Sequence, residues 1–504
     1  LFGELAKCSG TMTAAMTEIG VVSNPKEMAA RSNLTKVQQA NCVSALKLYI
    51  GSALLEAALA LSREGYAVCS NNLEFVVSYP ENGSGEGITK FMKEAIEGAL
   101  EFMNEYLTED NQLKPGQNVS LYSESEATAE WHKNNPPANK YMGDTVAAAT
   151  PDYGHSTHDY SLRVNGHLYM FSIPYAAQNI TNATLAKVYK GKAAELMRCF
   201  AGGNQDLMQG AMQTISGAME LKKGKLYERL GFVLPLNRLF GSSRFCVTGA
   251  NADYFQKIVQ QIVEAKLNVA IPAYADSIVR AVKAGDLQST SHVLLAPVGK
   301  GSLAMNNTAD GFEKRFIARL KAQIKRNLGE EYVGNIELLP NNDVDKLSVA
   351  QGLLDLKEAD NAGKKPEFVS RPDPTEYYVD IVYGEDEDGK NEFWTKLEAV
   401  NTDATRAQFR KMKEQIYDAA FDAIMKAYTY EMFEDSYNCW GYIGIGDGSF
   451  DDMIREQANQ EFESLRAELM MTKKSLIMAC PGLENELLCG AMLDLIIERY
   501  EGEE

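Results

Sequence analysis

The sequence has no long apolar run, no closely spaced pair of cysteines and no excess of basic residues. Its apolar runs stop well short of the roughly 18 residues that a membrane-spanning helix needs, and no pattern of a secretory signal peptide is present. The eight cysteines are scattered without a C-x-x-C pair, a distribution typical of free thiols in a reducing compartment. We therefore expect a cytoplasmic location and no membrane span.

Basic side chains are the minority charge. The 50 Lys and Arg residues stand against 69 Asp and Glu, which gives a formal net charge of −19 and a pI near 4.9. A protein that binds a nucleic-acid backbone needs a basic face, so we expect no nucleic-acid partner. The hydrophobic content of 45% and charged content of 24% are ordinary for a globular protein, and 504 residues favour more than one domain or subdomain.

The most informative stretch runs from Thr150 to Ile173. Asn165-Gly166 separates two apolar-rich runs, and this dipeptide is the strongest short-range signal of a β-hairpin, since both central residues of its tight turn need positive φ. A short polar loop before the hairpin holds Asp152, Gly154, Ser156, Thr157 and Asp159. The sequence therefore predicts a polar loop that leads directly into a hairpin.

Such a loop contains groups that can hold a phosphate and a metal ion. Gly154 allows close approach of the backbone to a ligand, and the N–H groups of a tight turn make an anion site. Ser156 and Thr157 can donate hydrogen bonds to a phosphate. Asp152 and Asp159 can hold Mg²⁺, which prefers carboxylates and water and usually shares phosphate oxygens. A plain polar turn between two strands is the alternative, because one short motif has little specificity.

A transition-metal site is a second alternative for the same loop. His155 and His158 lie between Asp152 and Asp159, and all four side chains are zinc ligands by type. A loop that enters a hairpin splays neighbouring side chains apart, so the sequence favours a phosphate over zinc.

The pattern D-x-G-x-x-T-x-D-x-S-L from Asp152 to Leu162 resembles the second phosphate-binding loop of the actin-like ATPases. This superfamily includes actins, heat-shock chaperone ATPases and sugar kinases. The resemblance implies an α/β protein with an actin-like (ribonuclease H-like) ATPase fold, in which two mixed-sheet lobes surround a cleft, followed here by a mostly helical C-terminal extension. It also implies ATP and Mg²⁺ as cofactors. Asp152 would be catalytic, Asp152 and Asp159 would hold the metal, and Gly154, Ser156 and Thr157 would contact phosphate.

Further segments occur in the order expected of this family. Leu73–Pro80 has the composition of a buried strand ended by proline. Ser123–Glu130 resembles the first connecting segment, where small residues let two domains cross closely, and the resemblance implies that the second catalytic residue, Glu126, orients the attacking water. The same residues fit an ordinary helix start, because Ser123 and Glu126 have the spacing of a capping box. Val349–Leu354 resembles the second connecting helix.

One more segment, Pro297–Ser302, lies between a predicted strand at His292–Ala296 and a predicted helix at about 311–327. A strand, a Gly-x-Gly-Ser turn and a helix resemble the adenosine loop of the family. The resemblance implies that Gly299, Gly301 and Ser302 contact adenosine, and that Lys300 meets phosphate or ribose.

The resemblance covers about Leu73 to Leu354 and suggests four parts of the chain. We expect a partial first lobe at 1–130, a second lobe with the phosphate and adenosine loops at 131–360, a linker at 361–375 and a mostly helical C-terminal domain at 376–504. The linker prediction rests on its prolines and mixed charge. Beyond it, Tyr377–Val382 has the composition of a strand, and Thr402–Phe433 has the spacing of one long helix.

Two features expected of the family are missing from the sequence. We find no Asp-x-Gly-Thr hairpin for a first phosphate loop, and Tyr175–Thr181 lacks the glycine pair that often follows the second. The sequence therefore predicts an ATP-binding, chaperone-like ATPase module in which closure of the cleft signals to a protein partner or to self-assembly. Because of the missing loop, it does not decide whether the module is an ATP hydrolase. A non-catalytic actin-like scaffold or filament subunit is the alternative.

Overall fold

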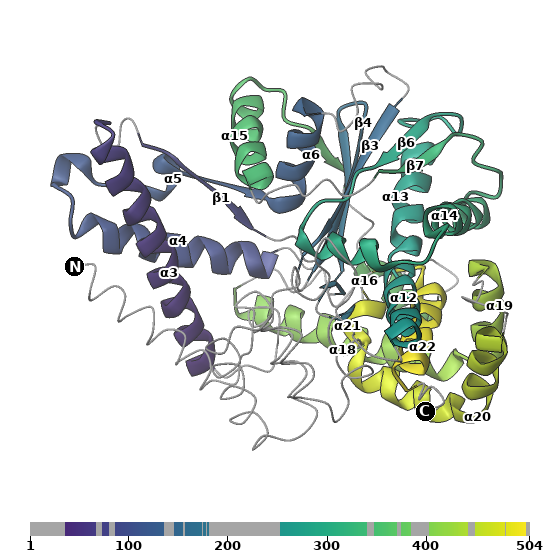
Figure 1. Ribbon diagram of the computed structural model, residues 1–504. Helices are drawn as coiled ribbons and strands as arrows, with labels where there is room; N and C mark the ends of the chain where they lie inside the picture. Colours follow the sequence, from purple (N-terminus) through teal and green to yellow (C-terminus); the bar gives the residue numbers. More distant parts are fainter. Residues whose placement is uncertain are drawn as a thin grey trace.

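The structure is a computed structural model, and it describes residues 36–66, 73–79, 86–135, 146–154, 157–173, 175–177, 179–180, 252–339, 347–369, 374–384, 403–441, 449–478 and 480–499. This part of the chain contains two β-sheets with helices packed around them (Figure 1). The expected α/β class with a mixed sheet is therefore confirmed. None of the helices in these ranges is both long and apolar enough to cross a membrane.

The larger sheet has six strands in the order β7-β6-β3-β4-β5-β8. The central strands β3, β4 and β5 form an antiparallel meander, while β6 and β7 on one side and β8 on the other pair in parallel. The strands are β3 (Val146–Tyr153), β4 (His158–Val164), β5 (His167–Ile173), β6 (His292–Leu295), β7 (Ile336–Leu338) and β8 (Glu367–Val369).

The turn between β4 and β5 is the hairpin that the sequence predicts. Asn165 and Gly166 have φ values of 49° and 82°, as the tight turn requires. The turn sets the register, with Val164 opposite His167 and Ser161 opposite Met170. Because successive side chains of a strand point to opposite faces, this register decides which residues share a face of the sheet.

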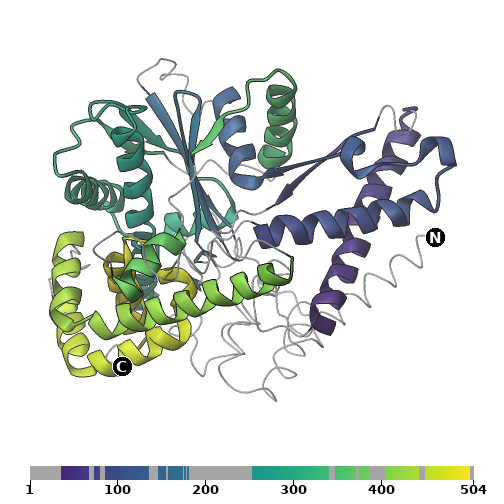
Figure 2. The same cartoon turned by 180° about the vertical axis from the view of Figure 1, so that it is seen from behind.

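The two faces of the meander have different character. On one face Tyr160, Tyr169 and Phe171 belong to the largest hydrophobic core, together with residues of α12, α13 and α14. The opposite face carries more polar residues, among them Thr150 and Ser161, and is covered by α6, on which α15 packs (Figures 1 and 2). The covering helices are α12 (Ala252–Asn268), α13 (Ile271–Lys283), α14 (Phe312–Leu328), α6 (Glu124–Asn134) and α15 (Leu347–Asn361).

The smaller sheet pairs β1 (Phe75–Tyr79) with β2 (Val119–Ser123) in parallel. Parallel neighbours need a crossover connection, which here consists of α4 (Glu86–Asn104), the 3₁₀ helix η1 (Glu109–Asn111) and α5 (Pro115–Asn118). One face packs on α4 and α3 (Lys36–Arg63), and the other packs on α15. Since β2 runs directly into α6, this segment joins the two sheets (Figure 1).

The C-terminal helices share the core of the larger sheet. Ile424, Phe462 and Leu493 belong to the same apolar cluster as Tyr160 of β4. The helices are α16 (Pro374–Tyr383), α18 (Asp403–Ala427), α19 (Tyr430–Trp440), α20 (Ser449–Thr472), α21 (Lys474–Ile477) and α22 (Glu484–Arg499). Residues beyond 376 therefore help to bury the sheet that carries the predicted phosphate loop.

The secondary-structure predictions for the C-terminal part need two corrections. Tyr377–Val382 is not a strand but lies in α16, where Tyr378 and Val379 are buried while Tyr377 and Asp380 are exposed. The segment Thr402–Phe433 is not one helix, because Thr429 caps a new helix by accepting a hydrogen bond from the Met432 N–H at 3.4 Å. The predicted linker contains β8, which extends the sheet beside β5.

Candidate functional site

The predicted phosphate loop is a tight connection between β3 and β4. Asp152 and Asp159 are cross-strand neighbours in the register, so both lie in strands and not in a loop as the sequence suggested. Only 154–157 remain as the turn, which is closed by a hydrogen bond from the Gly154 N–H to the Thr157 carbonyl at 3.0 Å. The two carboxylates therefore start from adjacent positions on one face of the sheet.

Asp159 is nearly fully buried, with 2% of its surface exposed. Its Oδ2 accepts a hydrogen bond from the Thr157 hydroxyl at 3.0 Å. Asp152 is partly exposed. Ser156 lies outside the described residues. The pair thus consists of one carboxylate held inside the turn and one at the surface.

The predicted adenosine loop lies directly against this turn. The Val298 N–H donates to the Pro151 carbonyl at 2.8 Å, and the Tyr153 N–H donates to the Val298 carbonyl at 3.1 Å. This short parallel bridge continues the pairing of β3 with β6 beyond the end of β6. Two segments that are about 146 residues apart in the sequence are therefore adjacent at one end of the sheet.

Gly299 and Gly301 make this contact sterically possible. Gly299 has a φ of 80°, and a Cβ atom there would lie 2.2 Å from Oδ1 of Asp152. A Cβ atom on Gly301 would lie 2.5 Å from the Tyr153 carbonyl oxygen and 2.9 Å from that of Gly154. The resemblance implies that these glycines admit adenosine; the space beside them in the structure is taken up by the β3–β4 turn and by Ala177.

Gly301→Ala is therefore expected to separate the two loops. The new methyl group would clash with backbone oxygens, which cannot rotate away, so we expect a loss of about 1–3 kcal/mol of unfolding free energy. Gly51→Ala is the control, because its nearest neighbour is a side-chain atom of Phe102 at 3.2 Å. Urea unfolding of both variants measures the difference, and equal stabilities would contradict the packing described.

The other two residues that the resemblance assigns to contacts in the adenosine loop are Lys300 and Ser302. Ser302 is fully buried, and its hydroxyl donates to the Gly299 carbonyl within the same turn. It therefore closes its own loop. The side chain of Lys300 lies outside the described part.

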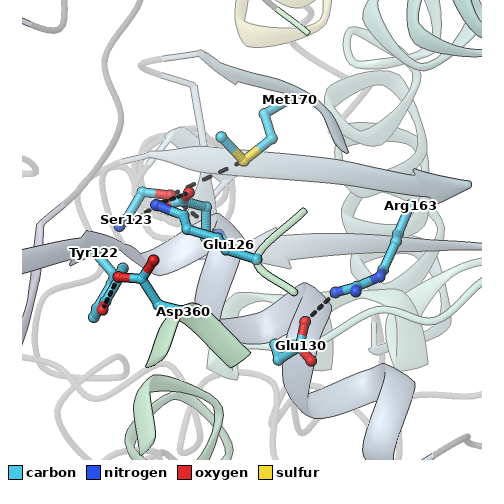
Figure 3. A network of polar contacts seen from close by, with 8 residues as sticks. Tyr122, Ser123, Glu126, Glu130, Arg163, Met170 and Asp360 are labelled. Atoms are coloured by element: carbon cyan, nitrogen blue, oxygen red, sulfur yellow. Dashed lines mark hydrogen bonds and ion pairs between the residues drawn. The ribbon is translucent and has the colours of Figure 1, made fainter. Parts of the chain in front are cut away.

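Glu126 lies at the first turn of α6 and serves the structure of that helix. The Ser123 hydroxyl accepts from the Glu126 N–H, and Oε2 of Glu126 accepts from the Ser123 N–H, each at 3.0 Å (Figure 3). This is the capping box that the sequence also allows. Its Oε1 forms an ion pair with Lys365 at 3.0 Å, so the carboxylate is already engaged at both oxygens.

α6 crosses the polar face of the meander, and its contacts locate Glu126 relative to the turn. The Ser123 hydroxyl lies 4.0 Å from the sulfur of Met170 on β5, and Glu130 pairs with Arg163 on β4 (Figure 3). His132 contacts the Thr150 hydroxyl on β3 at 2.6 Å. Strand alternation puts Asp152 on the same face as Thr150. Glu126 and the two aspartates therefore share this face, with Glu126 over its β5 side.

The other face of the turn is aromatic and separates His158 from the aspartates of the zinc alternative. His158 stacks on Tyr153, with ring centroids 3.7 Å apart, and its Nε2 lies 2.6 Å from the hydroxyl of Tyr274. Burial lowers the pKa of His158 to about 3, so its ring is neutral. Because His158 and Asp159 point to opposite faces, they cannot bind the same ion. His155 lies outside the described residues.

The donor set at the turn fits a hard cation. In the described ranges no three His, Cys, Asp or Glu side chains form a cluster that could hold a metal by themselves. Two carboxylates on facing strands match Mg²⁺, which usually takes one or two protein carboxylates and keeps several waters. Such an ion would need the remaining ligands from water or from a phosphate.

Sequence reasoning missed the residues that anchor α6. Lys365 stood in a predicted linker, and Tyr122, which donates to Asp360 at 2.7 Å (Figure 3), directly precedes the predicted connecting segment Ser123–Glu130 and belongs to no motif. The spacing of charges offered no signal, because these partners are brought together only by tertiary structure. No protein-family model matches the chain, and a search of curated proteins finds no match.

Proposed function

We propose that the chain binds ATP together with Mg²⁺ at the end of the larger sheet where the β3–β4 turn meets the loop 297–302. The observation that supports this most is the contact of these two loops, which the resemblance assigns to phosphate and to adenosine. A nucleotide presents both groups within one molecule. A site for it requires the two loops to be adjacent, as they are.

The architecture agrees with an actin-like fold. That fold needs mixed sheets, and the central meander with parallel strands at both edges is one. It also needs two connecting helices that cross closely. A Cβ atom on Gly352 of α15 would lie 2.0 Å from the carbonyl oxygen of Ala127 on α6, so the small residues at both predicted connecting segments allow this crossing.

Each group of residues at the site would have its own role in binding. Asp152 and Asp159 would hold Mg²⁺ through water, Thr157 would contact phosphate in exchange for its hydrogen bond to Asp159, and the loop 297–302 would lie next to the nucleoside. The bound Mg²⁺ would neutralise phosphate charge. Closure of the protein around the bound nucleotide would be a signal that a partner protein can sense.

A non-catalytic scaffold is the second candidate. The observation in its favour is the double engagement of Glu126 by Ser123 and Lys365, because a residue that orients water needs a free oxygen. In a hydrolase Glu126→Gln would lower the turnover of ATP without weakening its binding. If the protein is a scaffold, the wild type would bind ATP or assemble without hydrolysing ATP.

The experiment for the proposed site is calorimetric titration of ATP with Mg²⁺ into wild type, Asp152→Asn and Asp159→Asn. Each substitution removes one carboxylate charge and keeps the shape, so we expect Mg²⁺-dependent affinity to fall about tenfold or more, equivalent to about 1.4 kcal/mol. Asp435→Asn is the matched control, because Asp435 is 73% exposed on α19. Equal affinities in all four proteins would place the site elsewhere.

A further inference from the structure

The segment after β5 touches both loops of the candidate site. The Ala177 N–H donates to the Gly154 carbonyl at 3.3 Å. The Cβ atom of Ala177 also lies 2.8 Å from the position that a Cβ atom on Gly301 would take. A shift of Ala177 would therefore move the turn, the loop 297–302, or both.

Two residues earlier, Tyr175 is tied to the C-terminal helix α22. Its hydroxyl donates to Oδ2 of Asp494, and both side chains are buried, with 4% and 0% of their surface exposed. Asp494 also pairs with Lys266 of α12 at 3.0 Å, and Lys266 pairs with Glu498 at 2.7 Å. Residues 175–177 thus connect the candidate site with α12 and with α22, and the resemblance does not cover α22.

The surroundings of Tyr175 allow little freedom. The ammonium groups of Lys266 and Lys473 lie 5.4 and 5.5 Å from the centre of its ring, at distances typical of cation–π contacts. Burial lowers the pKa of Lys266 to about 8 and raises that of Asp494 well above its usual value. A buried ion pair is weak evidence for stability, since apolar replacements often do as well, and fixing a register is its best-attested use.

We infer that Tyr175 is a positioning residue for the β3–β4 turn, held in place by Asp494 and Lys266. The hydroxyl fixes residue 175 on α22, the two-residue spacing fixes Ala177, and Ala177 fixes the Gly154 carbonyl and the loop at Gly301. The C-terminal helices are then part of the site's framework. The expected effect on nucleotide affinity rests on the proposed function; the positioning of the turn does not.

The test compares Tyr175→Phe with Tyr169→Phe. Both substitutions remove one hydroxyl that donates to a carboxylate, since Tyr169 donates to Asp286 at 2.5 Å, but Tyr169 lies near the opposite end of β5. Amide hydrogen exchange without nucleotide is measured in peptides that cover 150–158 and 175–180. We expect faster exchange there in Tyr175→Phe and in Asp494→Asn, and wild-type exchange in Tyr169→Phe.

Unchanged exchange in both Tyr175→Phe and Asp494→Asn would overturn the inference, whether or not nucleotide binds. Equal acceleration in Tyr169→Phe would also overturn it, because the effect would then be general loosening. The Kd for ATP with Mg²⁺ is expected to rise about threefold to tenfold in Tyr175→Phe, the usual range for one lost hydrogen bond, and to stay within twofold of wild type in Tyr169→Phe. A wild type that does not bind ATP would refute the proposed function and leave the exchange result to decide the positioning role.

Discussion

Gly352→Ala is expected to lower the unfolding free energy by about 1–3 kcal/mol, although alanine is the better helix former. Gly352 lies where α15 crosses α6. The added methyl carbon would lie 2.0 Å from the Ala127 carbonyl oxygen and 3.0 Å from Cβ of Trp131. Neither atom can move without displacing the backbone of α6, so the two helices must separate.

Gly98→Ala is the matched control for this substitution. Gly98 also lies inside a helix, α4, and a Cβ atom there would lie 2.3 Å from Cε of Lys47. That neighbour is the end of a flexible side chain, which can rotate away. We expect a neutral or stabilising effect of up to about 1 kcal/mol from helix propensity. Similar losses in both variants by urea denaturation would contradict the close crossing.

Acidification from pH 7.5 to pH 5 is expected to destabilise the protein through two buried histidines. Burial lowers the pKa of His132 to about 4 and that of His158 to about 3, against about 6.5 in the unfolded chain. At pH values between the folded and the unfolded pKa, the unfolded state binds more protons than the folded state. The contribution of these histidines to stability is therefore fully present above pH 6.5 and decreases as the pH falls below it. At pH 5 the loss is about 2 kcal/mol for each histidine.

Replacing the two histidines with residues that cannot titrate should weaken the dependence of stability on pH. His132→Asn keeps a polar atom beside the Thr150 hydroxyl, and His158→Phe keeps the stack on Tyr153. We compare urea unfolding at pH 7.5 and pH 5, with His292→Gln as the control that retains both buried histidines. A double variant that loses as much stability as wild type would assign the pH dependence to other groups.

Local signals predicted much of the central sheet. The Asn165-Gly166 turn, the capping box at Ser123 and the strand at His292 are determined by residues close in sequence, and the structure confirms all three. The composition of Tyr377–Val382 wrongly predicted a strand, because aromatic and β-branched residues favour strands. In the structure two consecutive residues, Tyr378 and Val379, are buried between exposed neighbours, which fits a helix and not the alternation of a strand.

The candidate site could be predicted only in part. The turn residues Asp152 and Asp159 could be found from their pattern, but their pairing across β3 and β4 depends on the register. Glu126 could be located, while its partner Lys365 comes from a segment more than 200 residues later. The contribution of Tyr175 and Asp494 depends on the docking of α22 on the sheet, for which the sequence contains no local signal.

The central claim is that this chain binds ATP with Mg²⁺, and a thermal-shift titration of the wild type tests it most directly. ATP and ADP are each titrated with and without Mg²⁺. Because a ligand that binds the folded state raises its melting temperature, we predict a rise that increases with nucleotide concentration and is larger with Mg²⁺. An unchanged melting temperature at millimolar nucleotide, where a known ATPase responds, would contradict the account.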